Sequence, residues 1–292
     1  MDFVLWKPKK EGEIYWESPW CEGRPGWHIE CSVMSKRYLG DEIDIHAGGE
    51  DLIFPHHENE IAQSEAANGV PFAKYWMHNG FLNINNQKMS KSLGNFFTVR
   101  DIAEKYDLQV LRFFMLSAHY RSPLNFSADL MEAAKSGLER IKTAGDTLRR
   151  QMEAAGARDM SGNEKVSYEQ SAVYVEKFEA AMDDDANTAD AVSAVFELVK
   201  FANTNASAEN SREYLQKLYG RLQTLCEVLG IILEQEEEVD TELKTWVEAM
   251  IEERGAAKKA KNFARADEIR EELKSRGIIL EDTREGVKWK RA

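Results

Sequence analysis

The pentapeptide Lys-Met-Ser-Lys-Ser at residues 88–92 most constrains the fold of this chain, because it places two lysines and two hydroxyls in one short polar loop between apolar runs. Lysine offers a compact, mobile positive charge, and serine hydroxyls and loop N–H groups add hydrogen-bond donors. Such a loop suits a polyphosphate whose charge grows during group transfer, where positioning and electrostatics supply most of the rate. For an arbitrary Lys/Ser pentapeptide, a solvated surface connection is the alternative.

A candidate metal site lies upstream of this loop. Pro55 opens a stretch of strong helix formers, and its missing N–H would be unpaired at a first helical position in any case. His56 and Glu60 are four residues apart, so they would share one helix face. Together with the thiolate of Cys31 they form a mixed donor set that suits Zn²⁺. His57 and Glu58 would point elsewhere and could equally form a solvated face, and a lone cysteine is usually just buried.

The residues around both features resemble one enzyme family. The pentapeptide and the Leu-Gly-Asn after it are similar to the ATP-binding loop of class I aminoacyl-tRNA synthetases, and the blocks at 23–32 and 44–60 resemble cysteinyl-tRNA synthetase. The resemblance implies a zinc ion held by two cysteines, a histidine and a glutamate, which binds the sulfur of the substrate cysteine. Cys31, His56 and Glu60 match three of these four positions, so we expect them to be the metal ligands.

Two family features are missing from the sequence: the fourth zinc ligand and the His-Ile-Gly-His signature, both of which the family carries in an N-terminal half. We therefore expect the chain to correspond to the C-terminal portion of such an enzyme and to be inactive by itself. Cys21 stands where the family usually has glycine. It is either a makeshift zinc ligand or an unremarkable substitution.

The reaction that the resemblance implies has two steps. Cysteine and ATP, with Mg²⁺, give cysteinyl adenylate, and the aminoacyl group then moves to the 3′ end of cysteine tRNA, a step of protein biosynthesis. Serine differs from cysteine by oxygen in place of sulfur, which a pocket that reads shape discriminates poorly. Zinc prefers a thiolate ligand and would supply the selection.

The resemblance also assigns further site residues. They are the catalytic lysines Lys88 and Lys91, the ATP-binding residues Ser90, Lys91, Gly48, Gly49 and Asp51, and the substrate-pocket residues Trp27, His28 and His46. Each pocket residue can equally be a packed core residue.

Hydrophobic periodicity divides the chain into three parts, with a fold class of α/β plus all-α. Residues 1–127 alternate strand-like runs (43–46 and 80–84) with helices (24–38, 55–68 and 98–118). Residues 128–233 predict a helical bundle (128–154, 167–182, 187–204 and 209–232), and residues 241–292 predict two helices (241–254 and 262–275) followed by a hairpin. The resemblance implies the second half of a class I Rossmann-like catalytic domain, a tRNA-binding helical bundle and a small α+β anticodon-recognition domain.

Two polar segments have alternative interpretations. Three carboxylates at 183–185 resemble a family signature, although Ala186 stands where an aromatic is common. We favour a helix terminus in which Asp185 or Asn187 caps the next helix. Near the C-terminus, Trp289 either stacks on an anticodon base or packs the hairpin onto a helix. The RNA-binding residues implied there are Trp289, Lys288, Lys290 and Arg291.

Composition limits the remaining function classes. The three cysteines, at 21, 31 and 226, do not form a disulfide framework. No apolar run approaches a membrane span, so we expect a cytoplasmic monomer. The net charge of −13 argues against a general nucleic-acid binder, but residues 254–292 hold 12 Lys and Arg against 7 Asp and Glu. Two functions stay open: a cysteine-tRNA ligase that uses zinc, ATP and cysteine tRNA, and a non-catalytic fragment that retains only anticodon binding.

Overall fold

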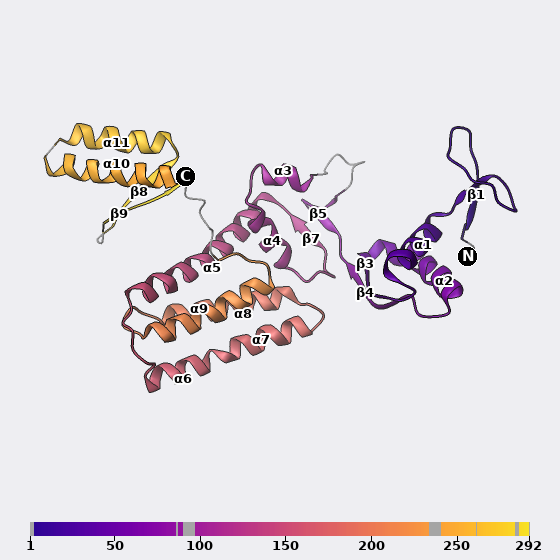
Figure 1. Cartoon of the computed structure of the whole chain (residues 1–292), viewed down its shortest axis with the longest axis horizontal. Coiled ribbons are helices and arrows are strands. Elements are labelled where there is room, and N and C mark those ends of the chain that lie inside the picture. The colour runs from indigo at the N-terminus through magenta and orange to yellow at the C-terminus, as the bar shows by residue number, and fades with distance from the viewer. Residues whose placement is uncertain are drawn as a thin grey trace. The chain divides into compact units, whose positions relative to one another are not determined.

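The computed structural model describes residues 3–85, 87–89, 97–233, 241–260, 262–283 and 286–291 (Figure 1). Two compact units, 1–234 and 235–292, divide the chain. Among the helices that the structure describes, none is long and apolar enough to cross a membrane.

The first unit begins with a short antiparallel strand pair, and a parallel βαβ arrangement follows. After the antiparallel pair β1 (Trp6–Pro8) and β2 (Gly23–Pro25) comes α1 (Trp27–Leu39). β3 (Ile43–Gly49) and β4 (Ala73–Asn79) pair in parallel, and α2 (Glu58–Asn68) lies in the connection between them and packs on α1. Parallel strands need a crossover connection of this kind, which brings the end of β3 beside the start of α2.

A second, three-stranded sheet follows. β5 (Leu82–Ile84) pairs antiparallel with β6 (Gln87–Lys88) and parallel with β7 (Leu124–Phe126). Between β6 and β7 lie α3 (Val99–Ala103) and α4 (Leu108–Leu116). The buried residues of α4 belong to the core of the helical bundle that follows, so α4 joins the two parts of this unit.

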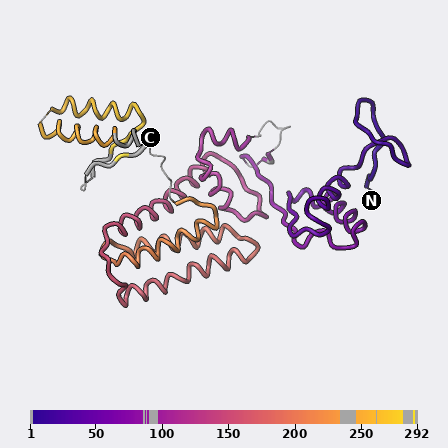
Figure 2. Tube along the Cα trace, in the orientation of Figure 1, coloured from indigo at the N-terminus to yellow at the C-terminus, as the bar shows by residue number. Residues whose placement is uncertain are grey.

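The bundle is built from α5 (Ala128–Ala154), α6 (Gly162–Gln170), α7 (Ala172–Asp183), α8 (Thr188–Asn205) and α9 (Arg212–Val228), and Figure 2 follows their trace. α5 contacts both α8 and α9, and α7 contacts α8. The apolar stripes of these helices form one core whose fully buried side chains include Met131, Ile141, Leu198, Leu215 and Leu218.

The second unit has its own small core. α10 (Thr241–Lys259) packs on α11 (Phe263–Ser275), and the antiparallel hairpin β8 (Ile278–Thr283) and β9 (Gly286–Arg291) follows. Among the described residues, this core consists of Val247, Met250, Ile269, Leu273 and Ile278. The predicted helix pair and hairpin are therefore confirmed.

Most predicted helices are confirmed, but three of them are interrupted. The predicted helix 98–118 divides into α3 and α4, because Asp107 accepts a hydrogen bond from the N–H of Gln109 and starts a new helix. The predicted helix 167–182 is also wrong in its bounds: α6 begins at Gly162, after the cap Ser161, and breaks at Ser171. There the Ser171 hydroxyl donates to the carbonyl of Tyr168 at 2.7 Å.

The third interruption moves the start of α2. Phe54 has non-helical torsions (φ −129°, ψ 129°), the Phe54–Pro55 peptide is cis, and residues Ile53–His57 form a π-helical turn. Helical torsions therefore resume at Pro55, the predicted first helical residue, although the α-helix α2 itself begins only at Glu58.

Candidate metal and substrate site

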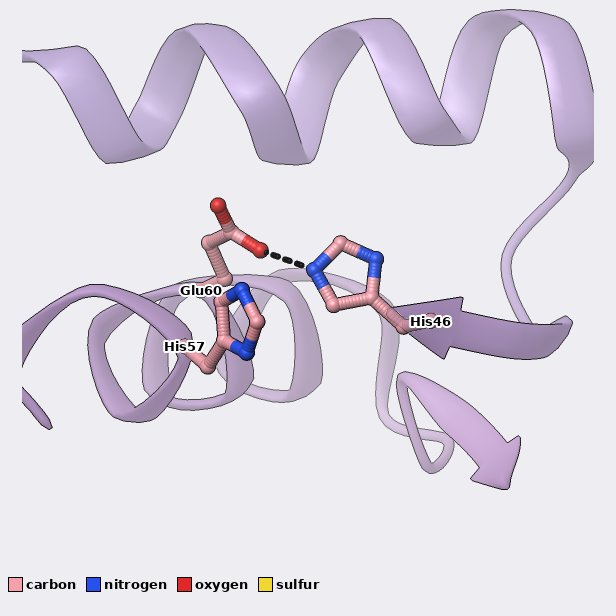
Figure 3. A group of neighbouring side chains, drawn as sticks. All are labelled: His46, His57 and Glu60. Atoms are coloured by element: carbon pink, nitrogen blue, oxygen red, sulfur yellow. Dashed lines mark ion pairs between the residues drawn. The ribbon is translucent and has the colours of Figure 1, made fainter. Parts of the chain in front are cut away.

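Glu60 on α2 lies at the centre of a group of possible metal ligands (Figure 3). The described residues include one set of three ligand atoms that all lie within 4.8 Å of one another, and it consists of His46, His57 and Glu60. β3 supplies His46, the turn before α2 supplies His57, and Glu60 comes from the first turn of α2. Glu60 and His57 are buried and His46 is half-buried, so the group is shielded from solvent.

Two atoms of this group lie close together, but neither forms a well-aligned hydrogen bond to a described residue. Nε2 of His46 lies 2.7 Å from Oε2 of Glu60, the pair marked by the dashed line in Figure 3. Both atoms are nevertheless buried without a hydrogen bond of acceptable geometry to any described residue. Buried polar atoms of this kind require an explanation. A cation ligated by both atoms from one side would give each of them a partner, so the donor set fits a bound cation.

Cys31 reaches this group from α1. Its thiol lies beside the Glu60 carboxylate, and burial, followed by the charge of Glu60, raises the pKa of the thiol. The sulfur is not among the atoms that all lie within 4.8 Å of one another, but it adds a fourth possible ligand next to Glu60. This mixed S/N/O set is the chemistry that zinc prefers.

His56, the predicted histidine ligand, lies in a neighbouring cluster. Its Nδ1 is 2.9 Å from Nε2 of His28, and its ring is 4.9 Å from that of Trp27. The predicted set Cys31, His56 and Glu60 is thus not the group that the structure brings within 4.8 Å. His57 and His56 precede Glu60 by three and four residues, so both can share its helix face, and the structure brings His57 to it. A ligand role for His56 stays a prediction.

His57 itself corrects the sequence analysis. It is buried, not part of a solvated face, and its Nδ1 lies 2.8 Å from Nε2 of His78. Burial, followed by the nearby His46 imidazole, lowers the pKa of His57. His78 and Trp76, whose ring is 4.8 Å from that of His46, were missed. Trp76 and His78 lie two residues apart on β4 and so share one face of the strand, which is the sequence signal that could have found them.

A small cavity opens beside the predicted substrate-pocket residues Trp27 and His28. It has a volume of about 270 Å³, and Asn59 also lines it. Asn59 Nδ2 lies 3.3 Å from Nδ1 of His28, so the amide fixes the orientation of this ring. Burial, followed by His56, lowers the pKa of His28. His46, the third predicted pocket residue, lies with Glu60 instead.

The predicted nucleotide-binding glycines lie at the carboxyl end of β3. A Cβ at Gly48 would be 2.8 Å from Cε1 of His57, and one at Gly49 would be 2.6 Å from Oδ1 of Asp51. A side chain at Gly48 would force the His57 ring to shift, and one at Gly49 would displace the Asp51 carboxylate. In open α/β sheets, ligands bind outside the carboxyl ends of the strands, which is where Gly48, Gly49 and Asp51 lie.

Several predicted residues fall outside the described part of the structure. They are Ser90 and Lys91, and the side chains of Lys88, Lys288, Lys290 and Arg291. Trp289 is described: it is half-buried and packs against the core of the second unit.

The βαβ arrangement, the glycines at the end of its first strand and the lysine pentapeptide define the class I aminoacyl-tRNA synthetase fold. The model described as the tRNA synthetases class I (C) catalytic domain matches residues 1–136. A solved LeuRS–tRNA–LeuAMS complex from Agrobacterium radiobacter shares the fold, with a TM-score of 0.55 and 15% identity over 73% of this chain and 31% of that one.

The other matches are more specific. The DALR domain matches residues 177–234, and the cysteinyl-tRNA ligase anticodon binding domain matches residues 240–289. The chain belongs to the cysteinyl-tRNA ligase family. It is 67% identical to the cysteine–tRNA ligase of Lachnospira eligens and 58% identical to that of Lachnoclostridium phytofermentans, in each case over 100% of this chain. It spans 61% and 63% of the lengths of these two relatives.

Proposed function

We propose that this chain provides the thiol-selecting and tRNA-binding parts of a cytoplasmic cysteine–tRNA ligase. The observation that supports this most strongly is the group around Glu60: two imidazoles and a carboxylate lie within 4.8 Å of one another, the Cys31 thiol lies beside the carboxylate, and two buried ligand atoms lack hydrogen-bond partners among the described residues. A bound zinc ion would supply a Lewis acid that prefers the sulfur of cysteine to the oxygen of serine.

The chain's own residues would orient and enclose the substrate. Trp27 and His28 line the cavity beside the metal group, and Asn59 holds the His28 ring. Gly48 and Gly49 lie at the carboxyl end of β3, where the nucleotide would bind, and Lys91 would meet the phosphates of ATP. Because the pKa values of His28 and His57 are lowered, both imidazoles are neutral at physiological pH and can accept hydrogen bonds or ligate a metal.

Zinc titration tests the metal proposal. We expect the chain to bind one Zn²⁺ and Glu60→Gln to weaken binding by at least about 100-fold, since even groups that only support a ligand contribute about 10–100-fold. Competition with a chromophoric chelator measures the affinity. Glu58→Gln, an exposed glutamate on the same helix, is the matched control. Equal affinities for the two variants would contradict the proposal.

A second candidate function is anticodon binding without catalysis, which the independent core of the second unit favours. The two functions differ in pyrophosphate exchange. We expect no cysteine-dependent exchange of pyrophosphate into ATP by this chain alone, because it has no His-Ile-Gly-His signature to hold ATP from the other side and positioning supplies most of the rate. Exchange that survives stringent purification and disappears in Lys91→Ala would show that this chain completes the site by itself.

A further inference from the structure

One exposed carboxylate of the bundle, that of Asp185, accepts hydrogen bonds from residues 120 and 121 in the connection between α4 and β7. Asp185 lies in the turn between α7 and α8, and Tyr120 and Arg121 lie in the connection between α4 and β7. The Tyr120 hydroxyl donates to Oδ1 of Asp185 at 2.7 Å, and Nε of Arg121 donates to Oδ2. His119 Nε2 is 3.9 Å from the same Oδ2. Each carboxylate oxygen therefore has its own donor, 64 or 65 residues away in sequence.

The turn that carries Asp185 adopts an unusual backbone. Asp185 and Ala186 have φ values of 57° and 53°, a left-handed conformation that costs free energy in residues other than glycine. Asn187 caps α8 by accepting from the N–H of Asp190, so capping by Asn187 is confirmed and Asp185 is not the cap. Asp185 instead points its carboxylate at the 119–121 segment. Strained backbone persists where the surroundings over-determine it, and such positions are often functional.

The other side of the 119–121 segment holds the start of β5. The Gly80 N–H donates to the carbonyl of Tyr120 at 2.8 Å, and the Leu124 N–H donates to the carbonyl of Phe81 at 2.9 Å. A Cβ at Gly80 would lie 2.5 Å from the carbonyl carbon of Ser122, so the two segments are in direct contact. β5 leads through β6 into the lysine pentapeptide. The 119–121 segment thus bridges the bundle turn and the start of the hairpin that precedes the ATP-binding loop.

We propose that Asp185 is a positioning residue: it couples the α7–α8 turn of the helical bundle to the start of β5 through Tyr120 and Arg121, and so sets the hairpin that carries the lysine pentapeptide. This role rests on the proposed function in that the bundle binds tRNA and the pentapeptide binds ATP. The contacts themselves lie within the first compact unit. The two donors act on one carboxylate, which gives the network a geometry that a single surface ion pair lacks.

Selective ¹⁵N-glycine labelling of the whole chain tests the proposal, because Gly80 reports on the start of β5 and Gly145, buried in α5, reports on the bundle. Asp185→Gly removes the carboxylate and relieves the left-handed backbone. We expect it to speed hydrogen exchange at Gly80 by about five-fold, a factor within the range for exposed ion pairs, and to leave Gly145 unchanged. Asp184→Asn, which removes the neighbouring exposed carboxylate, should change neither amide.

Two results would overturn the proposal in the free chain. One is unchanged exchange at Gly80 in Asp185→Gly. The other is equal acceleration at Gly80 and Gly145, which would indicate general destabilisation of the first unit. Arg121→Ala combined with Asp185→Gly should have the effect of Asp185→Gly alone, because that change already removes the partner of Arg121. Multiplying effects would contradict a shared network.

Cysteine tRNA supplies the second arm of the test. We expect tRNA to shift the Gly80 resonance in the unmodified chain and in Asp184→Asn, and to bind Asp185→Gly without shifting it. An equal Gly80 shift in Asp185→Gly would overturn the coupling. If tRNA binds none of the chains, the proposed function of the bundle fails, while the exchange rates of the free chain still decide the role of Asp185.

Discussion

Replacing Glu164 with alanine is expected to lower the free energy of unfolding of the first unit by about 3 kcal/mol. Glu164 is buried and accepts hydrogen bonds from Nη1 and Nη2 of Arg158, each at 2.8 Å. It also accepts from the N–H groups of Ser161 at 2.7 Å and Ser211 at 2.8 Å. One carboxylate therefore completes the cap of α6 and links it by a hydrogen bond to the start of α9. Its removal leaves the buried N–H of Ser211 without a partner, which carries most of the penalty.

The pH dependence gives this prediction a second measurement. Arg158, followed by the Ser161 and Ser211 N–H groups, holds the pKa of Glu164 far below its ordinary value. A lowered carboxyl pKa stabilises the fold fully above the ordinary value and progressively less as the pH falls below it. The difference between unmodified chain and Glu164→Ala in urea unfolding should thus be constant near neutrality and shrink from about pH 5 to pH 3. Glu169→Ala, exposed on the same helix, is the control.

Replacing Trp289 with alanine is expected to destabilise the second unit by about 3 kcal/mol. Trp289 pairs with Leu280 across the β8–β9 hairpin, and its half-buried ring packs against the core formed by α10, α11 and β8. We therefore favour the packing interpretation over base stacking. Hydrogen exchange of the buried Ile269 and Leu273 amides in α11 measures the loss, and Trp289→Phe should keep most of the stability because it keeps an aromatic ring in the site.

The stacking interpretation predicts a different pair of results. If Trp289 reads an anticodon base, Trp289→Ala should leave exchange in α11 unchanged and weaken binding of the cysteine tRNA anticodon stem-loop by about 1–3 kcal/mol. That outcome would contradict the packing account. If Trp289→Ala speeds exchange in α11 while stem-loop affinity at low temperature is still unchanged, the packing account is supported.

The sequence predicted the bundle well because its signals are local. Ser127 precedes a long amphipathic stretch and accepts from the Leu130 N–H, and the helix runs over the predicted residues Ala128–Ala154. The capping box of Thr98 and Asp101 was also readable, and it is present. Ser161 and Glu164 form a second box that the same pattern could have found. Where a cap and a periodic stripe agree, local sequence determines the helix.

The site could not be predicted to the same depth, because its geometry depends on contacts between separate elements. On a helix from Pro55, both His56 and His57 can share a face with Glu60. Spacing alone does not decide between them, and the structure brings His57 to Glu60. The contribution of His46 depends on how β3 lies against α2, and spacing in sequence does not report that. Asp185 was correctly placed at a helix terminus, but its partners are at least 64 residues away, beyond any local pattern.

Cobalt substitution of the metal group tests the central claim most directly. Co²⁺ can take the place of Zn²⁺ at a tetrahedral N/S site and makes the ligands visible by absorption. The account predicts a sulfur-to-cobalt band from Cys31 in the loaded chain, a further increase of that band on adding one equivalent of L-cysteine, and no change with L-serine. The Glu60→Gln chain should show neither this band nor its increase with L-cysteine. A spectrum that cysteine leaves unaltered, or that serine alters equally, would contradict a thiol-selecting metal site.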